Sequence, residues 1–585
     1  MCGIAGVFTT DSSSPAGRIM ERLEDALAHR GPDGRGRHDG AGISMIHARL
    51  SIIDLETGGQ PIYAEDAALI ANGEIYNYLE LRDGLDGCVL TTRSDCEPAL
   101  LLYLRCGVDF TDHLRGMYAI AIHDARRDRL VLARDPFGIK PLYYAETDLG
   151  FVFASEPQAL TKAGLVVPDL CRAAVDELLQ LQFTCGAKTA FDGIHRVLPG
   201  ETLVVEKGRI VERRRRPALP AGGPQPWGEE EAVHRLDMAL ADSVAMHQRS
   251  DVPYGMFLSG GVDSSALLAL MRDLNDAPVQ AFTAGFPGAG VHDERDHAKA
   301  VAGAAGADFE AVEVAEDDLW KLLPGIASAV DDPVADYAVL PTYKLAAVAR
   351  ERGLKVILTG EGGDELFGGY GRYRRALRSR LLGGRPMYAK GAFAGMDVLR
   401  RDDGDWRLGV AAAEAAEALP GRSRLQVCQA VDCADWLPND LLAKLDRCLM
   451  AHGVEGRVPF LDAGVAEVAF RLPDNLKIKG KTGKWLLRKW LEGKLPEARP
   501  FAEKRGFTVP VGEWISARGK DLGALVAEQP CIEEICRPGA VERLFTASGA
   551  KQGKAAWTLL FFALWHNIHI KGISPGGDVF ESLGG

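Results

Sequence analysis

The sequence predicts two successive domains, an α+β domain followed by an α/β domain whose parallel sheet has helices on both faces. Three observations support this fold class. The chain of 585 residues is too long for one domain. The first 200 or so residues are dense in short apolar runs separated by turn signals. Beyond a segment rich in Arg, Pro and Gly, Ala- and Leu-rich helical patterns alternate with short β runs.

In the first domain, helical patterns at Ala16–Leu27 and Glu97–Leu104 favour an α+β over an all-β fold. The run Arg213–Arg216 stands beside the Pro- and Gly-rich PALPAGGPQP, which indicates a solvated linker better than a basic binding patch. We therefore expect domains at 1–212 and 228–585, joined by a linker at 213–227. The predicted strands of the first domain are ISMIHARLSIID, AALIANGEIYN, MYAIAIHD, DRLVLARDPFG and GFVFASE.

In the second domain, the expected parallel strands are YGMFL, VQAFTAGF and LKVILTG. Val410–Leu419 is an Ala-rich helix candidate. Ala555–Trp565 is the most apolar helical stretch, but it has about half the length that a bilayer requires, so we expect a buried helix.

Composition excludes several classes of protein. The chain is 47% hydrophobic and 25% charged, as in globular proteins, and its net charge of -13 argues against a nucleic-acid partner. The absence of a secretory pattern and of a long apolar span predicts a cytoplasmic protein without a membrane partner. The eleven cysteines are then expected to be reduced. The spacings Cys428–Cys433 and Cys531–Cys536 lack partner histidines and do not indicate zinc.

The chain begins MCGIAGVF, with a thiol at the second position. Removal of Met1 would make Cys2 the N-terminus, so that its sulfur would lie beside its own α-amine. This amine has an ordinary pKa of roughly 8 and could serve as the base for a nucleophilic sulfur. A single cysteine near a terminus also occurs by chance, so the remaining motifs must decide.

A glycine-rich loop, SGGVDSS, follows the YGMFL strand and opens into a helical pattern. Its glycines let the backbone approach an anion, its serines offer hydroxyl donors, and the helix N-terminus supplies free N–H groups. The Walker lysine is absent. LKVILTGEGGDELFGGY, about a hundred residues later, is a second strand that opens into a glycine-rich acidic loop. Asp263 and Asp364, one in each loop, are natural Mg²⁺ ligands beside phosphate oxygens.

SGGVDSS resembles the PP-loop of the ATP-pyrophosphatases, which split ATP between its α and β phosphates. The chain as a whole resembles the glutamine-dependent asparagine synthetases of the B type, and the likeness covers essentially its full length. The motifs that carry it are MCGIAGVF, HRGPD, HARLSIID, NGEIYN, RSDCE, RDPFGIKPLYY, SGGVDSS, TGEGGDELFGGY, KLDRCLMAHGVEGRVPFLD and KRGFTVPVGEW.

For the first domain, the resemblance implies a class II glutaminase with the αββα sandwich of N-terminal-nucleophile enzymes. Cys2 would attack the glutamine amide and release ammonia, with its α-amine as base. Asn72 and the N–H of Gly73 match the oxyanion hole, where one donor is typically worth ~3 kcal/mol. The glutamine-binding positions implied are Asn72 and Gly73, with Arg49 for the carboxylate and Glu74 and Asp95 for the ammonium.

For the second domain, the resemblance implies formation of an acyl-adenylate that ammonia then attacks, after crossing an internal passage between the domains. Glu361 would take a proton from ammonia, and Lys484 would neutralise charge on the phosphates. The acceptor positions are Glu361, Asp364 and Arg457, and the Mg²⁺ ligands are Asp263 and Asp364. A homodimer is the family habit. The ATP-contact positions implied are Leu258, Ser259, Gly260, Gly261, Asp263, Ser264, Ser265, Ala284, Thr359 and Gly360.

Some positions depart from the family pattern. Cys448 and Leu449 replace small or hydroxylated residues, Gly456 replaces a residue with a side chain, and Tyr337 replaces a small residue. The segment 371–433 is also longer than usual. Such changes are either neutral drift or a reshaping of the acceptor pocket. Aspartate is the leading acceptor, and another carboxylate in a polysaccharide or natural-product pathway is the alternative.

Other functional classes fit less well. A non-catalytic relative would be expected to lose some of the motif residues, all of which are present. Stand-alone glutaminases and sugar-phosphate amidotransferases share Cys2 but do not explain SGGVDSS.

Overall fold

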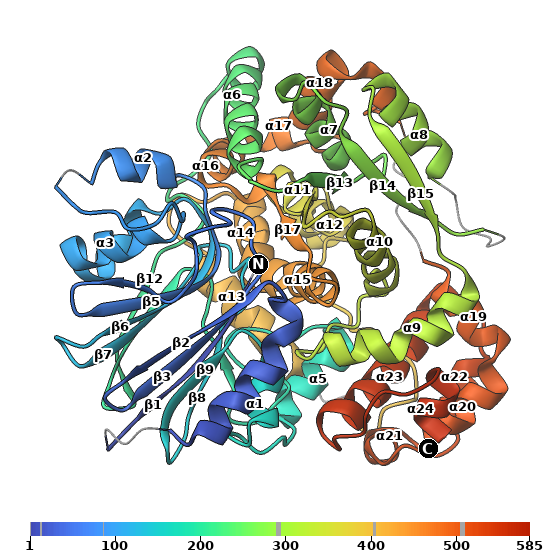
Figure 1. The fold of residues 1–585 in the computed structure, drawn as a ribbon. Coiled ribbons are helices and arrows are strands. Elements are labelled where there is room, and N and C mark those ends of the chain that lie inside the picture. The colour runs from blue at the N-terminus through green and yellow to red at the C-terminus, as the bar shows by residue number, and fades with distance from the viewer. Residues whose placement is uncertain are drawn as a thin grey trace.

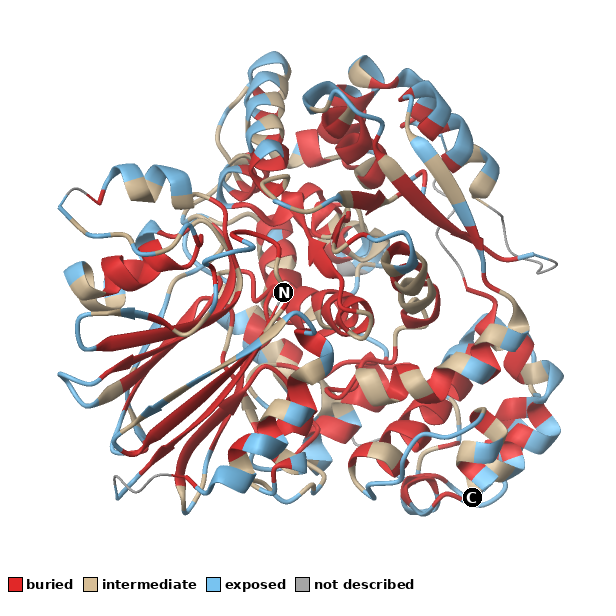
Figure 2. Ribbon diagram, in the orientation of Figure 1, coloured by how far each residue is buried: buried red, intermediate tan, exposed pale blue. Residues whose placement is uncertain are grey.

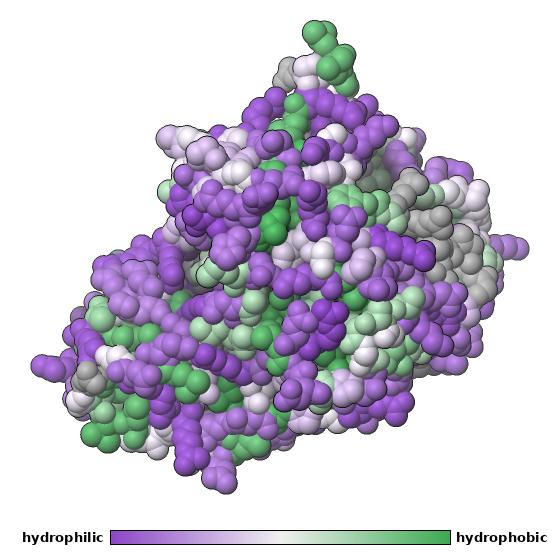
Figure 3. Space-filling model, turned by 90° about the horizontal axis from the view of Figure 1, so that it is seen from above, coloured by the Kyte–Doolittle hydropathy of each residue, from purple (hydrophilic) through white to green (hydrophobic). Residues whose placement is uncertain are grey.

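The computed structural model describes residues 2–11, 15–85, 87–287, 294–401, 405–502 and 509–584, without the side chain of Arg380. Met1 and residues 504–508 of the KRGFTVPVGEW motif lie outside the described residues. Among the described helices, none is both long and apolar enough to cross a membrane. The face of the molecule that is seen from above carries mostly hydrophilic side chains, with apolar ones scattered among them (Figure 3).

The first domain contains two six-stranded antiparallel sheets that lie face to face (Figure 1). The strand order is β10-β8-β9-β1-β3-β2 in one sheet and β12-β11-β7-β6-β5-β4 in the other. The strands are β1 (Gly3–Thr9), β2 (Gly34–Gly40), β3 (Ile43–Arg49), β4 (Ile62–Ala64), β5 (Ala67–Ile75), β6 (Gly116–Asp124), β7 (Arg129–Arg134), β8 (Tyr143–Glu146), β9 (Gly150–Ala154), β10 (His195–Arg196), β11 (Glu201–Glu206) and β12 (Arg209–Arg215).

Alternation of side chains along the strands builds three layers of core, as strand β1 shows. Ile4 and Phe8 lie between the two sheets, whereas Ala5 and Val7 face the helices on the outer side. Helices cover both outer faces, which confirms the predicted αββα sandwich. They are α1 (Gly17–Leu27) and α4 (Pro157–Lys162) on the first sheet, α2 (Tyr78–Asp83) and α3 (Glu97–Cys106) on the second, and α5 (Arg172–Leu181) near the second domain.

The linker predicted at residue 213 is wrong for its first three arginines, because strand β12 extends to Arg215. Arg213, Arg214 and Arg215 pair with Leu203, Thr202 and Glu201 of β11. The arginine run is the end of a charged edge strand, a common protection against pairing with other chains.

The second domain is built on a five-stranded parallel sheet in the order β15-β14-β13-β16-β17. The chain moves outward from β13 to β15 and then crosses back to the other side of β13. The carboxyl ends of β13 and β16 therefore flank the point where open α/β sheets bind ligands. The predicted strands are confirmed as β13 (Tyr254–Phe257), β14 (Gln280–Gly285) and β16 (Val356–Leu358), beside β15 (Asp308–Glu313) and β17 (Glu455–Arg457).

Helices surround this sheet and form a C-terminal bundle (Figure 1). The apolar stretch at 555–565 is confirmed as a buried helix within α23 (Figure 2). The helices are α6 (Glu229–His247), α7 (Val262–Leu274), α8 (Arg295–Ala304), α9 (Glu316–Ala329), α10 (Val339–Glu351), α11 (Gly363–Phe367), α12 (Gly371–Leu377), α13 (Leu408–Glu417), α14 (Arg424–Val431), the π-helix η5 (Asp432–Leu442), α15 (Ala443–Met450), α16 (Ala463–Arg471), α17 (Asp474–Lys477), α18 (Trp485–Lys494), α19 (Val511–Ala517), α20 (Gly519–Ala527), α21 (Pro530–Ile535), α22 (Ala540–Thr546), α23 (Ala550–His569) and α24 (Val579–Gly584).

Candidate active sites in the two domains

Cys2 lies just before β1, and its backbone is held from two sides. Its N–H donates to Asn72 Oδ1 over 3.1 Å, and its carbonyl accepts from Arg30 Nε, also over 3.1 Å. Burial raises the pKa of the Cys2 thiol, and the nearby Glu74 and Glu455 raise it further. The sulfur is therefore kept as a thiol in a fixed position, and it needs a base to become a nucleophile.

Asn72, on β5, presents an unused donor beside this thiol. Its Oδ1 is occupied by Cys2, while its Nδ2 is buried and has no hydrogen-bond partner in the described part of the chain. A buried amide nitrogen without a partner is costly unless a ligand completes it. The side chain is thus oriented to donate into the space next to Cys2.

Gly73 follows on the same strand and directs a second donor to the same edge. The N–H groups of Ala71 and Ile75 donate to side chains at this edge, so by alternation the N–H of Gly73 points there too. Its φ is +153°, and a Cβ would lie 2.0 Å from the carbonyl oxygen of Met117. The position therefore requires glycine.

Two buried carboxyl groups stand near these donors. Asp95 Oδ2 accepts the Ile75 N–H over 2.7 Å, and burial raises the pKa of Asp95 to about 6. Glu74 Oε2 lies 3.6 Å from Arg457 Nη2, and burial, with Glu455 and Asp95, raises the pKa of Glu74 well above its ordinary value. Arg49 lies at the end of β3, where its Nη2 donates to the carbonyl of Asp54.

The SGGVDSS loop connects β13 to α7, as the sequence predicts. Leu258 N–H donates to Phe282 O over 2.8 Å, and Gly260 turns the chain with a φ of +71°. The hydroxyls of Ser259 and Ser264 lie 3.1 Å apart. Ser265 Oγ, by contrast, is buried without a partner in the described structure, so it can serve a ligand at the start of α7.

The second loop, after β16, contacts the first one closely. A Cβ on Gly360 would lie 2.9 Å from Asp263 Cβ, and one on Gly363 would lie 2.5 Å from Asp263 Oδ1. Thr359 N–H donates to Arg457 O over 2.8 Å, while Thr359 Oγ1 is buried without a partner among the described residues. Two buried hydroxyls without a partner among the described residues, those of Ser265 and Thr359, therefore belong to the two loops that follow β13 and β16, where the strand order switches.

Lys484 joins the two loops. It precedes α18 in the left-handed conformation, with a φ of +54° and a side chain that is almost completely buried. Its Nζ contacts Asp263 Oδ2 and lies 2.7 Å from Asp364 Oδ1. The two carboxylates outweigh the effect of burial and raise the pKa of Lys484. The motif thus brings together a cation and two carboxylates from three separate segments.

Glu361 adjoins a charged group that sequence reasoning missed. Burial raises the pKa of Glu361, and Lys444 opposes this shift. Lys444 is buried and forms an ion pair of 2.7 Å with Asp336. The motif KLDRC contains Lys444, but the sequence gives no sign that Asp336, more than a hundred residues earlier, is its partner.

The guanidinium of Arg457 makes none of its described contacts with Asp263, Asp364 or Lys484. Its guanidinium donates to Glu455 Oε1 over 2.6 Å and to two backbone carbonyls of residues 247 and 249. It also faces Glu74 of the first domain. These contacts give its expected acceptor-binding role no support, and that role stays a prediction.

Two of the departures from the family pattern compensate each other. A Cβ on Gly456 would lie 3.1 Å from Leu445 Cγ and 3.2 Å from Leu449 Cδ2. The missing side chain of Gly456 therefore accommodates Leu449, which is fully buried. Cys448 is also fully buried, and its Sγ lies 3.6 Å from Val339 O. Tyr337 is half-buried beside Asp336.

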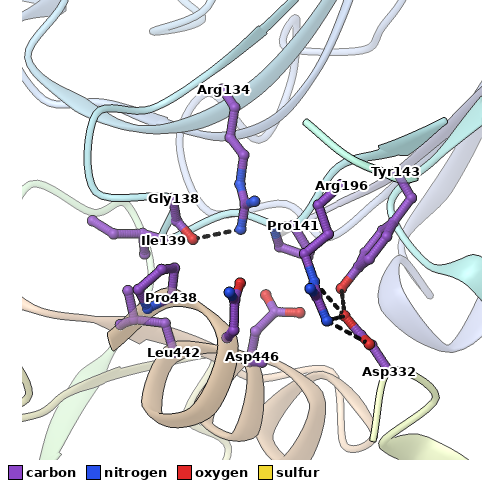
Figure 4. Close-up of a pocket in the computed structure, with 12 residues that line it drawn as sticks. Arg134, Gly138, Ile139, Pro141, Tyr143, Arg196, Asp332, Pro438, Leu442 and Asp446 are labelled. Atoms are coloured by element: carbon purple, nitrogen blue, oxygen red, sulfur yellow. Dashed lines mark hydrogen bonds and ion pairs between the residues drawn. The ribbon is translucent and has the colours of Figure 1, made fainter. Parts of the chain in front are cut away.

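The interface between the domains is rich in buried ion pairs. Arg30 binds Glu156 and, across the interface, Asp446, each over 2.8 Å. Arg196 binds both oxygens of Asp332, over 2.7 and 2.8 Å. A small cavity at this interface is lined by Arg196, Asp332 and Asp446, among others, so that both domains form its walls (Figure 4).

The donor set fits Mg²⁺ only together with a phosphate. The described residues contain no cluster of three or more His, Cys, Asp or Glu side chains arranged to hold a metal ion. Asp263 and Asp364 provide two carboxylates, and Mg²⁺ is usually bound by one or two carboxylates with phosphate oxygens and water.

A buried cysteine with two aligned donors, on a two-sheet sandwich joined to a glycine-rich anion loop, defines a glutamine amidotransferase fused to a nucleotide-dependent domain. Residues 1–215 match the glutamine amidotransferase domain family, and residues 235–567 match the asparagine synthase family. The chain belongs to the glutamine-hydrolysing asparagine synthetase family.

Relatives of full length support this assignment. Asparagine synthetase [glutamine-hydrolyzing] 1 of Bacillus subtilis is 32% identical over 98% of this chain and 97% of its own length. A putative asparagine synthetase of Mycobacterium bovis is 34% identical over 98% of both chains. The amidase chyE of Penicillium rubens is 32% identical, but over only 65% of this chain and 60% of its own.

Proposed function

We propose that this protein makes asparagine from aspartate, with glutamine as nitrogen donor and ATP as activating substrate. AMP and pyrophosphate are the expected by-products. The observation that carries the proposal is Lys484, held between Asp263 and Asp364 of the two loops, whose neighbours Ser265 and Thr359 have buried hydroxyls without a partner in the described structure. Full-length similarity to asparagine synthetases supports the same activity.

In the first domain, Cys2 acts as the nucleophile. Its α-amine, freed by removal of Met1, takes the thiol proton, and the sulfur attacks the glutamine amide carbon. Asn72 Nδ2 and the Gly73 N–H stabilise the oxyanion that forms. The buried Glu74 and Asp95 are acidic partners for the glutamine ammonium, and Arg49 is a partner for its carboxylate.

In the second domain, the two loops bind ATP. Ser259, Ser264 and Ser265 donate to phosphate oxygens, and the start of α7 adds its free N–H groups. Lys484 moves from the carboxylates toward the phosphates as negative charge builds up on them. Mg²⁺, held by Asp263 and Asp364 with ATP oxygens, would neutralise part of that charge. Glu361 takes a proton from the attacking ammonia.

A panel of carboxylic acids, each offered as the acceptor, is the direct test of this function. Purified full-length enzyme is supplied with ATP, Mg²⁺, glutamine and one carboxylic acid at a time, and pyrophosphate, AMP and ADP are measured. We expect aspartate to give the largest release of pyrophosphate, with AMP and without ADP. A response to another acid and none to aspartate would favour amidation of a different carboxylate. Release of ADP and phosphate would contradict the adenylation mechanism.

Replacement of the nucleophile separates the two half-reactions. Cys2→Ala should abolish use of glutamine and leave synthesis from ammonium chloride largely intact, because the second site does not use the thiol. Amino-acid analysis of asparagine formed with each nitrogen donor provides the measurement. Loss of both activities in a folded variant would contradict the proposed division of labour. A homodimer, a cytoplasmic location and a second domain at 228–585, after a linker that begins beyond β12, are further proposals for this chain.

A further inference from the structure

Asp440 is a buried carboxylate that the proposed mechanism does not use. It lies in the π-helix η5, where it is 1% exposed, and both its carboxylate oxygens lack a hydrogen-bond partner in the described structure. Burial raises the pKa of Asp440 well above its ordinary value, and Asp336 raises it further. A buried carboxyl without partners costs several kcal/mol at the order-of-magnitude level unless it stays protonated or a ligand completes it. Wide π-helical turns often occur at functional sites.

The position of Asp440 links it to the acceptor loop. Asp440 and Lys444 are four residues apart on a continuous helical segment, so their side chains lie on the same face. Lys444 forms its ion pair with Asp336, and its charge also acts on Glu361. Asp440 therefore stands beside the group that borders Glu361, the proposed acid–base residue.

A lysine on helix α23, Lys554, lies near Asp440 and Asp336. Trp557 Nε1 donates to Ala335 O over 2.8 Å, and Thr558 Oγ1 accepts from Gln182, which itself binds Ala335 O. This face of α23 therefore lies against the segment that carries Asp336. Lys554, one turn earlier, is on the same face; it is exposed, and its ammonium has no partner among the described residues. The acidic groups whose charge acts on Lys554 are Asp440 and Asp336.

The neighbouring cations are already engaged. Lys444 binds Asp336, and Arg372 binds Asp432 over 2.7 Å while it stacks on the ring of Tyr370, 3.8 Å from the ring centre. The buried carboxylate of Asp440 and the exposed ammonium of Lys554 thus remain unpaired beside Asp336, whose partner Lys444 acts on Glu361. A pair of opposite, unfilled charges is complementary to a zwitterion.

We propose that Asp440 and Lys554 bind the amino-acid end of the acceptor, Asp440 its α-ammonium and Lys554 its α-carboxylate. The proposal rests on the proposed function and deepens it, because it restricts the acceptor to α-amino acids with a second carboxylate. That second carboxylate reaches Glu361 and the nucleotide loops. Neither Asp440 nor Lys554 touches the reacting atoms, so both are specificity residues.

Three acceptors test the two proposed contacts separately. Aspartate carries both end groups, succinate lacks the ammonium, and β-alanine lacks the α-carboxylate. Pyrophosphate release is measured with ATP, Mg²⁺ and ammonium chloride, so that the glutaminase site takes no part. We expect wild-type enzyme to have a KM for aspartate at least tenfold below that for either analogue.

The variants then assign the contacts. Asp440→Asn should raise the KM for aspartate at least tenfold, with a small change in kcat, and leave succinate unaffected. Lys554→Met should raise the KM for aspartate similarly and leave β-alanine unaffected. Lys551→Met is the matched control on the same helix, because its ammonium donates to Ala394 O outside the acidic group, and it should change neither KM. Unchanged hydrolysis of glutamine shows that each variant is folded.

Each result decides the subsite separately from the function. If wild type uses aspartate but both variants keep its KM, the subsite is wrong and asparagine synthesis stands. If aspartate is inert and the panel finds another acceptor, the function is wrong, and the subsite survives only if that acceptor is an α-amino acid. If Asp440→Asn does not fold, wild-type enzyme that treats aspartate and succinate alike still overturns the proposal.

Discussion

Asp95 shows how burial, with the nearby charge of Glu455, can set the working pH of one residue. Its carboxyl has a pKa of about 6, above its ordinary value because burial disfavours the charged form. For folding, a raised pKa means that the contribution of Asp95 to stability is fully present below about pH 4 and is lost as pH rises through 6. For function the sign is opposite, since the glutamine ammonium needs the ionised form.

The glutaminase reaction should therefore have an acid limb. We expect kcat/KM for glutamine to rise with pH through an apparent pKa near 6, which is that of Asp95 in the free enzyme. Asp95→Asn should lower kcat/KM and remove this limb, while ammonia-dependent synthesis keeps its own profile. Initial rates of glutamate formation between roughly pH 5 and 8 test this, because that range brackets the pKa of Asp95, about 6. A variant that keeps the limb would assign it to another group.

At the same scale, the motifs and the family resemblance singled out Cys2, Asp263, Asp364 and Lys484, and the structure brings the last three together, while their roles stay predictions. The sequence could not predict Asp440. Nothing in the letters WLPNDLL shows that a carboxylate lacks partners, since that depends on every element that surrounds it.

Strand β17 and helix α15 are matched to each other in shape. Gly456 leaves room for Leu449 and Leu445, so two unusual residues seen in the sequence form one packing arrangement. From the sequence, these departures could be neutral drift or a reshaping of the acceptor pocket. The structure places this change in the core behind β17, where it concerns stability.

A double-mutant cycle measures this match. Gly456→Ala should lower the free energy of unfolding by about 1–3 kcal/mol through overpacking. Leu449→Ala should lower it by about 2–5 kcal/mol through a cavity. The double variant should lose less than the sum, because each change relieves the other. Urea unfolding gives the values, and Gly493→Ala, which meets open space, is the control. Strict additivity would contradict the match.

Strand β12 marks a limit of prediction at the scale of elements. Four consecutive arginines next to Pro and Gly are typical of a linker, yet Arg213 finds Glu201 over 2.8 Å and the hydroxyl of Tyr144. Whether such a run forms a strand or a linker depends on its partners on neighbouring strands, which a local sequence pattern does not show.

Across the whole molecule, buried ion pairs hold the two domains together. Arg196 and Asp332 come from different domains, and both are almost completely buried. The hydroxyl of Tyr143 also donates to Asp332, over 2.9 Å (Figure 4). Contacts between residues more than a hundred positions apart could not be read from the sequence. The sequence predicted two domains but not what joins them.

Removal of one partner should weaken the whole enzyme. Asp332→Asn leaves the guanidinium of Arg196 buried without its counter-charge, which costs about 3–5 kcal/mol. We expect a lower melting temperature and separate calorimetric transitions for the two domains. Glu534→Gln is the control, because Glu534 pairs with Arg172 in water at the surface and should change little. A melting curve like that of wild type would show that the pair is dispensable.

The buried ion pairs between the two domains also restrict how such enzymes can be rebuilt. A chimaera that joins this glutaminase half to a synthetase half without acids at the positions of Asp446 and Asp332 would bury Arg30 and Arg196 without counter-charges. Recombination between relatives therefore requires that both members of each interdomain ion pair are present in the product. Engineers who want a new nitrogen donor for this catalyst must transplant matched pairs along with the half that carries them.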